Sequence, residues 1–102
     1  RRIAPYDPLW FEEPVPPDAP EEMAKVARAS SVPIAAGERL ATKYDFARLL
    51  QAGSAAILQP NLGRVGGILE AKKIAAATQK VVKKTTGAKK APARKLKTNR
   101  EA

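Results

Sequence analysis

The sequence predicts an α/β protein with parallel strands, because short apolar runs alternate with stretches of helical spacing. The apolar runs cover residues 9–11, 32–36 and 55–58. Each run is too short for a core helix, and none alternates apolar with polar residues as a half-exposed strand would. We therefore expect three strands that are buried on both faces, as in a parallel sheet, with Trp10 and Phe11 in the core.

Helix start and stop signals lie between these runs. Residues 18–21 have the pattern of a capping box with Pro20 in the first turn, and residues 42–45 form a second such start, which Gly53 closes. The glycines at 66–67 open a third segment, in which an apolar face recurs at helical spacing. Three strand-helix units of about 25 residues each favour part of a (β/α)8 barrel over a doubly wound sheet.

Composition excludes several classes of function. The 102 residues contain no Cys and no His, so a disulfide framework, a thiolate metal site and a self-contained hydrolase triad with a His base are not expected. No apolar run approaches the length of a membrane-spanning helix. We therefore expect a cytoplasmic protein that makes no contact with membranes. The first residue is Arg1 rather than Met, which suggests a piece of a longer protein.

The net charge of +9 is concentrated at the end of the chain. Residues 1–77 contain 10 basic and 9 acidic side chains, whereas residues 78–102 contain 9 basic and one acidic side chain. Large apolar residues are nearly confined to the first part. We therefore predict a folded barrel fragment over residues 1–77 and a disordered basic tail over residues 78–102.

Polar side chains follow each predicted strand. The strand ends read Glu12-Glu13-Pro14, Gly37-Glu38-Arg39 and Gln59-Pro60-Asn61. Ligands of parallel α/β proteins bind at the carboxyl ends of the strands, and carboxylates from neighbouring ends can hold a hard cation such as Mg²⁺. The alternative is that the glutamates only pair with nearby basic side chains such as Arg39.

These three motifs, with the 26-residue interval between Glu12 and Glu38 and the glycine pair beyond them, resemble the enolase superfamily. Within it the sequence is most similar to the mandelate racemase branch, and there to the sugar-acid dehydratases that include galactonate dehydratase. The resemblance covers residues 1–77 in order. It implies a fragment of the (β/α)8 barrel domain of that superfamily.

The resemblance also implies roles for individual residues. Glu12 and Glu38 match the second and third carboxylate ligands of the family's Mg²⁺ ion, whereas the Asp that supplies the first ligand would lie before Arg1. Asn61 stands where the family usually has an Asp that orients a catalytic His, and that His would lie one strand later. An Asn can accept a hydrogen bond but offers no negative charge. From the residues alone, Asn61 could equally well only form a turn after Pro60.

The function that the resemblance implies is removal of a proton next to the carboxylate of a sugar acid, by a dehydratase or a related racemase that forms homo-oligomers. This chain alone is expected to be inactive, because the first metal ligand and the acid-base residues are not among its residues. Two rival hypotheses remain. The Lys-rich tail could bind nucleic acid nonspecifically through its phosphates, or the chain could be a nonfunctional truncated product.

Overall fold

Three short parallel strands form the sheet of the computed structural model, which describes residues 2–85 and, for burial of side chains, residues 2–81. The strands are β1 (Phe11–Glu12), β2 (Ile34–Ala36) and β3 (Ile57–Leu58), and they lie in the order β1-β2-β3. Both pairings are parallel. The prediction of a parallel α/β arrangement is therefore confirmed, while residues 86–102 of the predicted tail lie outside the described residues.

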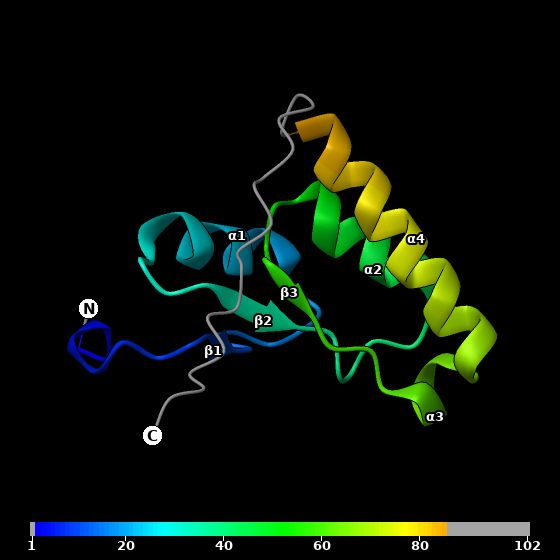
Figure 1. The fold of residues 1–102 in the computed structure, drawn as a ribbon. Coiled ribbons are helices and arrows are strands. Elements are labelled where there is room, and N and C mark those ends of the chain that lie inside the picture. Colours follow the sequence, from blue (N-terminus) through cyan, green and yellow to red (C-terminus); the bar gives the residue numbers. More distant parts are fainter. Residues whose placement is uncertain (1, 86–102) are drawn as a thin grey trace, which may run out of the picture.

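Helices alternate with these strands (Figure 1). In chain order they are a 3-10 turn η1 (Ala4–Tyr6), α1 (Pro20–Ala29), α2 (Lys43–Gln51), α3 (Leu62–Val65) and α4 (Ile68–Thr85). The helix α1 connects β1 to β2, and α2 connects β2 to β3, so each parallel pair is joined by a helical crossover. The short α3 was not predicted from the sequence.

Strand register defines two faces of the sheet. Phe11 pairs with Ile34, and Glu12 pairs with Ala35, which in turn pairs with Ile57. Side chains alternate along a strand, and paired residues of parallel strands share a face. Glu12, Ala35 and Ile57 therefore form one row, and the neighbouring row from Ile34 and Ala36 faces the helices.

The core lies between that helix-facing row and the helices. One cluster joins Ile34 and Ala36 of β2 to Met23 of α1 and Leu49 of α2. A second cluster joins Phe46 of α2, Val65 of α3 and Ile74 of α4. Because Phe46 and Leu49 lie on one helix, α2 connects the two clusters. In Figure 1, α2 and α4 run side by side.

Strand β1 is much more exposed than expected. Trp10 and Phe11 are 42% and 39% exposed, so the prediction that both are core residues is wrong. The physical reason is that β1 is an edge strand of the described sheet, and only β2 pairs with it. By contrast, the residues of β2 are all buried, as predicted for a central parallel strand.

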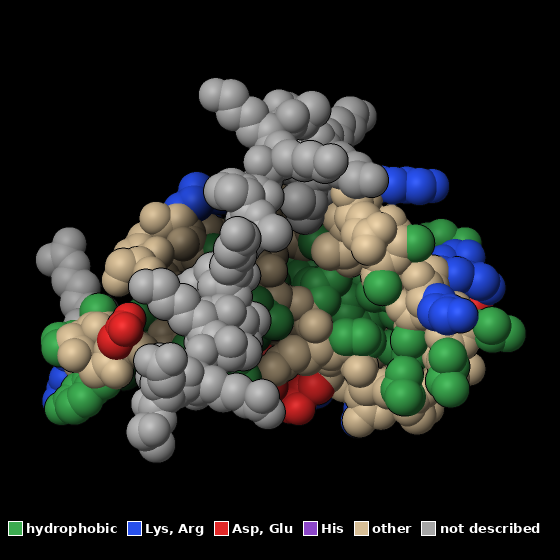
Figure 2. All heavy atoms as spheres, viewed as in Figure 1, with side chains coloured by type: hydrophobic (Ala, Val, Ile, Leu, Met, Phe, Trp, Pro, Cys, Tyr) green, Lys and Arg blue, Asp and Glu red, His purple; other side chains and the backbone are tan. Residues whose placement is uncertain are grey.

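Large apolar side chains remain exposed over much of the surface. Figure 2 shows such side chains gathered over the region of α3 and the start of α4. The exposed set is Ile3, Tyr6, Leu9, Trp10, Phe11, Tyr44, Leu62, Ile68 and Leu69. This exposed apolar surface is extensive for so short a chain. Surfaces of this kind are typically covered by other protein segments.

The helix α4 continues past the domain border placed from composition at Ala77 and ends at Thr85. Fewer apolar side chains of α4 are buried than the helical spacing of its apolar residues predicts. Ile74 is buried and Ala71 is half-buried, whereas Ile68 is 66% exposed. Among the described residues, none of the helices is both long and apolar enough to cross a membrane.

The two predicted capping boxes have different outcomes. Thr42 Oγ1 accepts a hydrogen bond from the Asp45 backbone N–H (3.2 Å), and Asp45 Oδ2 accepts one from the Thr42 backbone N–H (3.0 Å). The box at the start of α2 is therefore confirmed. At α1 the N-cap is Ala19, with no side-chain hydrogen bond. The predicted box at residues 18–21 is wrong, although Pro20 does occupy the first turn.

The capping box should make the stability of the first turn of α2 depend on pH. The Thr42 hydroxyl also donates a hydrogen bond to Asp45 Oδ2 (2.7 Å), and this bond is the main cause that lowers the pKa of Asp45 below its ordinary value of 3.8. A carboxyl whose pKa is lowered in the folded state stabilises that state above its unfolded pKa, and the stabilisation is lost as the pH falls through the folded pKa. We therefore expect hydrogen-exchange protection of the Thr42 amide to stay constant from neutral pH to about 4 and to fall below it.

Replacement of Asp45 by Asn should remove this dependence and lower the protection at neutral pH. The matched control is Asp18→Asn, because Asp18 precedes α1 without capping it. We expect Asp18→Asn to leave the hydrogen-exchange protection at the start of α1 unchanged. If Asp18→Asn lowers the protection at the start of α1 as much as Asp45→Asn lowers it at the start of α2, this account of the capping box is contradicted.

Candidate metal centre at the strand ends

Four polar side chains singled out from the sequence lie where the strands end. Glu12 is the last residue of β1, Glu13 follows it, and Glu38 and Arg39 follow β2 after Gly37. Because β1 and β2 are adjacent and parallel, their carboxyl ends lie at the same edge of the sheet. The structure thus brings Glu12 and Glu38 to neighbouring strand ends on that edge.

Glu12 projects from the sheet face opposite the helix-facing row. Its carboxylate is exposed, and its Oε2 accepts a long hydrogen bond of 3.5 Å from Trp10 Nε1. Trp10 and Glu12 are two residues apart on a strand, so they share this face. Neither Glu12 nor Glu38 forms an ion pair within residues 2–81, so no basic side chain of this part of the chain neutralises either carboxylate.

Gly37 determines how the chain leaves β2 before Glu38. Its φ is +130°, a conformation that side chains rarely adopt. A Cβ at this position would lie 2.7 Å from Cε1 of the Phe46 ring and 3.2 Å from the Gln59 backbone nitrogen. Gly37 therefore allows the chain to pass closely over α2 and β3 and to present Glu38 at the strand end.

We expect Gly37→Ala to destabilise the chain by about 2 to 5 kcal/mol, because strained backbone and overpacking against Phe46 add together. The full chain should lose most of its helical circular dichroism signal at low temperature. Gly53→Ala is the matched control, because Gly53 also has positive φ (69°) but nothing lies within 4 Å of its added Cβ. Equal losses in both variants would show that the contact with Phe46 has no effect.

Glu13 and Arg39 form the ion pair of this edge. Glu13 Oε2 accepts hydrogen bonds from Arg39 Nε (2.9 Å) and lies 2.9 Å from Arg39 Nη2. The Glu13 side chain is only 9% exposed, while that of Arg39 is 51% exposed. The structure thus shows a pairing of a strand-end glutamate with Arg39, as the alternative in the sequence analysis allowed, but the glutamate is Glu13.

Two polar residues at the end of β3 complete the edge. The Gln59 backbone N–H donates to Ala36 O (3.0 Å), while its side-chain Oε1 is buried without a hydrogen-bond partner among the described residues. Asn61 is the N-cap of α3, and its Oδ1 accepts a hydrogen bond from the Arg64 backbone N–H (3.1 Å). The sequence suggested only a turn at Asn61 after Pro60, and it predicted neither the N-cap nor the buried Gln59 oxygen. Asn is a preferred N-cap residue and Gly66 is the C-cap of α3, so these two residue types were the available signal for the short helix.

The side chains at this edge of the sheet supply some, but not all, of the oxygen ligands that a hard divalent cation needs. Carboxylate oxygens are the ligands that Mg²⁺ takes, and Glu12 and Glu38 supply two of them from adjacent strands. Within residues 2–81, no group of three or more Asp, Glu, His or Cys side chains could hold a metal ion. A complete site therefore requires a further ligand from outside this part of the chain.

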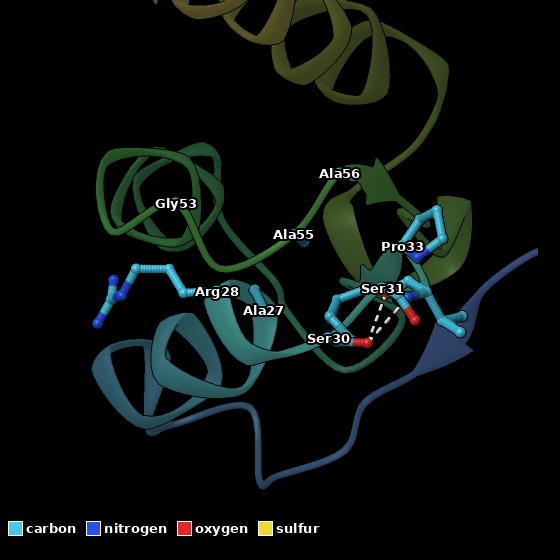
Figure 3. A pocket seen from close by; sticks show the side chains of 10 residues that line it. Ala27, Arg28, Ser30, Ser31, Pro33, Gly53, Ala55 and Ala56 are labelled. Carbon is cyan, nitrogen blue, oxygen red and sulfur yellow. Dashed lines mark hydrogen bonds between the residues drawn. The ribbon is translucent and has the colours of Figure 1, made fainter. Parts of the chain in front are cut away.

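The pocket in Figure 3 lies at the other end of the sheet. Its lining includes residues 30–34 together with Gly53, Ala55 and Ala56, and these segments lead into β2 and β3 rather than out of them. The Ser30 hydroxyl is occupied locally, because it donates to Val32 O (2.8 Å) and accepts from the Val32 N–H (3.0 Å). In Figure 3, Arg28 points away from the pocket. This apolar pocket has no part in the candidate metal centre.

Comparison with known proteins assigns the family. The model of the family described as "Enolase C-terminal domain-like" matches residues 1–85, and the chain therefore belongs to this family. D-galactonate dehydratase from Ralstonia pickettii is 47% identical over 79 residues, which cover 78% of this chain and 21% of that protein. The resemblance inferred from the three strand-end motifs is thus confirmed.

Solved structures agree with this assignment. A mandelate racemase/muconate lactonizing enzyme from Sulfitobacter sp. is 66% identical with a TM-score of 0.75, over 78% of this chain and 20% of that one. L-talarate dehydratase from Polaromonas sp. JS666, solved in complex with Mg and L-glucarate, is 33% identical with a TM-score of 0.76, over 80% of this chain and 23% of that one. The chain spans about a fifth of the length of these relatives.

Proposed function

We propose that this chain supplies consecutive strand-helix units of a (β/α)8 barrel in a Mg²⁺-dependent enzyme that removes the proton next to the carboxylate of a sugar acid. The observation that carries the proposal is the placement of Glu12 and Glu38 at the ends of two adjacent parallel strands, in a chain that belongs to the enolase C-terminal domain family. D-galactonate dehydratase and L-talarate dehydratase, which act on sugar acids as their names state, support this substrate class.

In this proposal Glu12 and Glu38 hold the metal. Both carboxylates are exposed, free of ion pairs in the described residues, and carry the hard oxygen donors that Mg²⁺ requires. When bound, Mg²⁺ stabilises the negative charge that develops on a substrate carboxylate as its neighbouring proton leaves. Gly37 and the β1-β2 pairing keep the two carboxylates at one edge of the sheet.

Asn61 has a more indirect role in the proposed enzyme. Its Oδ1 accepts the Arg64 N–H at the start of α3, and an amide oxygen can accept a second hydrogen bond through its other lone pair. We propose that this second bond comes from a base on the following strand, which this chain does not supply. As an uncharged acceptor, Asn61 would orient that base without stabilising its protonated form.

The chain by itself is proposed to be inactive. Two carboxylates without a third ligand bind Mg²⁺ weakly, and residues 1–102 include no His to act as the acid or base. The exposed apolar side chains on β1, α3 and α4 fit this proposal, because the rest of a barrel would cover them.

A chimera tests the proposal. The 79 residues that match D-galactonate dehydratase from Ralstonia pickettii replace their counterpart in that enzyme, and dehydration of D-galactonate is measured with Mg²⁺ and with excess chelator. We expect turnover that depends on Mg²⁺, and no turnover by the 102-residue chain alone. A folded chimera that is inactive with Mg²⁺, or one that is fully active in excess chelator, would contradict the proposed function.

A further inference from the structure

Glu13 is held in an unusual backbone conformation directly after the proposed ligand Glu12. Its φ is +42°, in the left-handed region that residues with a Cβ rarely adopt. Its backbone N–H donates to Ala35 O (2.9 Å), a bond that belongs to the pairing of Glu12 with Ala35. The unfavourable φ therefore lies directly after Glu12, the last residue of β1, where the chain leaves the sheet.

The position of the Glu13 side chain is also energetically unfavourable. It is 9% exposed, and its Oε1 is buried without a hydrogen-bond partner among the described residues. Only Oε2 has a partner, the Arg39 guanidinium. Burying an unsatisfied polar atom and keeping a strained φ are both unfavourable, and such features persist where the surrounding structure imposes them.

The pair has a direct geometric relation to the proposed ligands. Glu13 and Arg39 are 26 residues apart, and each directly follows one ligand, Glu12 or Glu38. The guanidinium therefore bridges the two strand ends one residue beyond the carboxylates that are proposed to share a metal. A bridge at this point limits how far the two ends can move apart.

We propose that the Glu13-Arg39 pair is a positioning device that holds Glu12 and Glu38 at the separation needed for one Mg²⁺ ion. This inference rests on the proposed function. Glu13 and Arg39 are positioning residues, since neither is proposed to contact the metal or the substrate. Groups that orient metal ligands typically change metal affinity by about 10- to 100-fold when they are removed.

The test measures Mg²⁺ affinity and kinetics of the chimera described above in three forms: unchanged, with Glu13→Gln and with Arg39→Lys. Both variants keep a polar group of similar length but remove either the charge or the planar fork. The matched control is Glu22→Gln, which breaks the exposed Glu22-Lys25 pair on α1 (2.7 Å). Calorimetric titration gives the dissociation constant of Mg²⁺, and thermal unfolding without metal gives the change in stability.

We expect Glu13→Gln and Arg39→Lys each to weaken Mg²⁺ binding by about 10-fold or more. The double variant should have the same Mg²⁺ dissociation constant as the single variant that binds Mg²⁺ less tightly, because either change alone already breaks the pair. Saturating Mg²⁺ should restore most of kcat, and Glu22→Gln should leave the affinity unchanged. A Mg²⁺ affinity within about twofold of the unchanged chimera, with only a lower unfolding midpoint, would show a purely structural pair and overturn the inference.

The two proposals fail in different ways. If the unchanged chimera folds but neither binds nor requires Mg²⁺, the proposed function fails and the positioning role fails with it. If the unchanged chimera binds and requires Mg²⁺ while the Glu13 and Arg39 variants bind it equally well, only the positioning role is overturned.

Discussion

Glu38→Gln in the chimera should lower the Mg²⁺-dependent turnover of D-galactonate by at least about 10³-fold, because a catalytic site that loses a charge-stabilising group loses most of its rate. Gln keeps the size of the side chain but replaces an anionic oxygen donor by a neutral amide. Glu38 is exposed and forms no ion pair among residues 2–81, so its replacement should leave the fold intact. Turnover is measured over a range of Mg²⁺ concentrations, with circular dichroism to check folding.

The control for this prediction is Glu21→Gln. Glu21 is an exposed carboxylate in the first turn of α1, nine residues after Glu12, and it is not one of the proposed ligands. We expect it to leave turnover unchanged. Undiminished activity of a folded Glu38→Gln chimera would remove Glu38 from the metal site, whereas equal losses in both variants would show that the effect is not specific to the strand end.

The second large effect concerns folding of the 102-residue chain alone. We expect partial helicity, a broad and weakly cooperative thermal transition, and association at micromolar concentration. The reason is that the edge strand β1 and nine large apolar side chains are exposed, and unpaired strand edges and apolar patches promote association. Small domains also bury too little surface to be robust.

Circular dichroism and analytical ultracentrifugation check this prediction together. The chimera serves as the comparison, because the rest of the barrel is present in it and should cover the exposed side chains. We expect the chimera to unfold in a sharper transition at a higher temperature. A clean monomer of the 102-residue chain with a sharp two-state transition would mean that the chain is a complete domain by itself.

Local signals in the sequence predicted the sheet and most helices because they depend on few neighbours. The Thr42-Asp45 capping box forms as predicted because Thr42 has the extended backbone that an N-cap requires (φ −120°, ψ 152°). The same pattern failed at Asp18, where the Ala19 N–H donates to Pro16 O instead. That turn makes Ala19 the N-cap, so Asp18 lies one residue too early to cap the helix.

Burial was harder to predict because it depends on segments that neighbour a residue in space. Trp10 and Phe11 have the composition of a buried strand, but only one strand pairs with β1 in the described residues. The helix α4 posed a related problem, because its last turns are rich in Lys and Thr and yet remain helical to Thr85. Composition indicates whether a segment can bury surface, and it does not fix where a helix ends.

The candidate site was predictable in its residue types and less so in its geometry. The family motif indicated Glu12 and Glu38, and the alternation of side chains along β1 places Glu12 and Glu13 on different sides of the strand. The positive φ of Glu13 and the close approach of Gly37 to Phe46 have no local sequence signature that distinguishes them from ordinary strand ends. Both features involve contacts between segments that are distant in the sequence, namely the Glu13-Arg39 pair and the approach of Gly37 to Phe46 and Gln59.

The most direct measurement for the central claim is a crystal structure of the chimera grown with Mn²⁺ in place of Mg²⁺, because Mn²⁺ takes similar oxygen ligands and gives an anomalous signal. The account predicts one anomalous peak at the carboxyl ends of β1 and β2, with carboxylate oxygens of both Glu12 and Glu38 at about 2.0 to 2.3 Å. An ion bound by neither glutamate, or both carboxylates engaged in ion pairs with no peak between them, would contradict it.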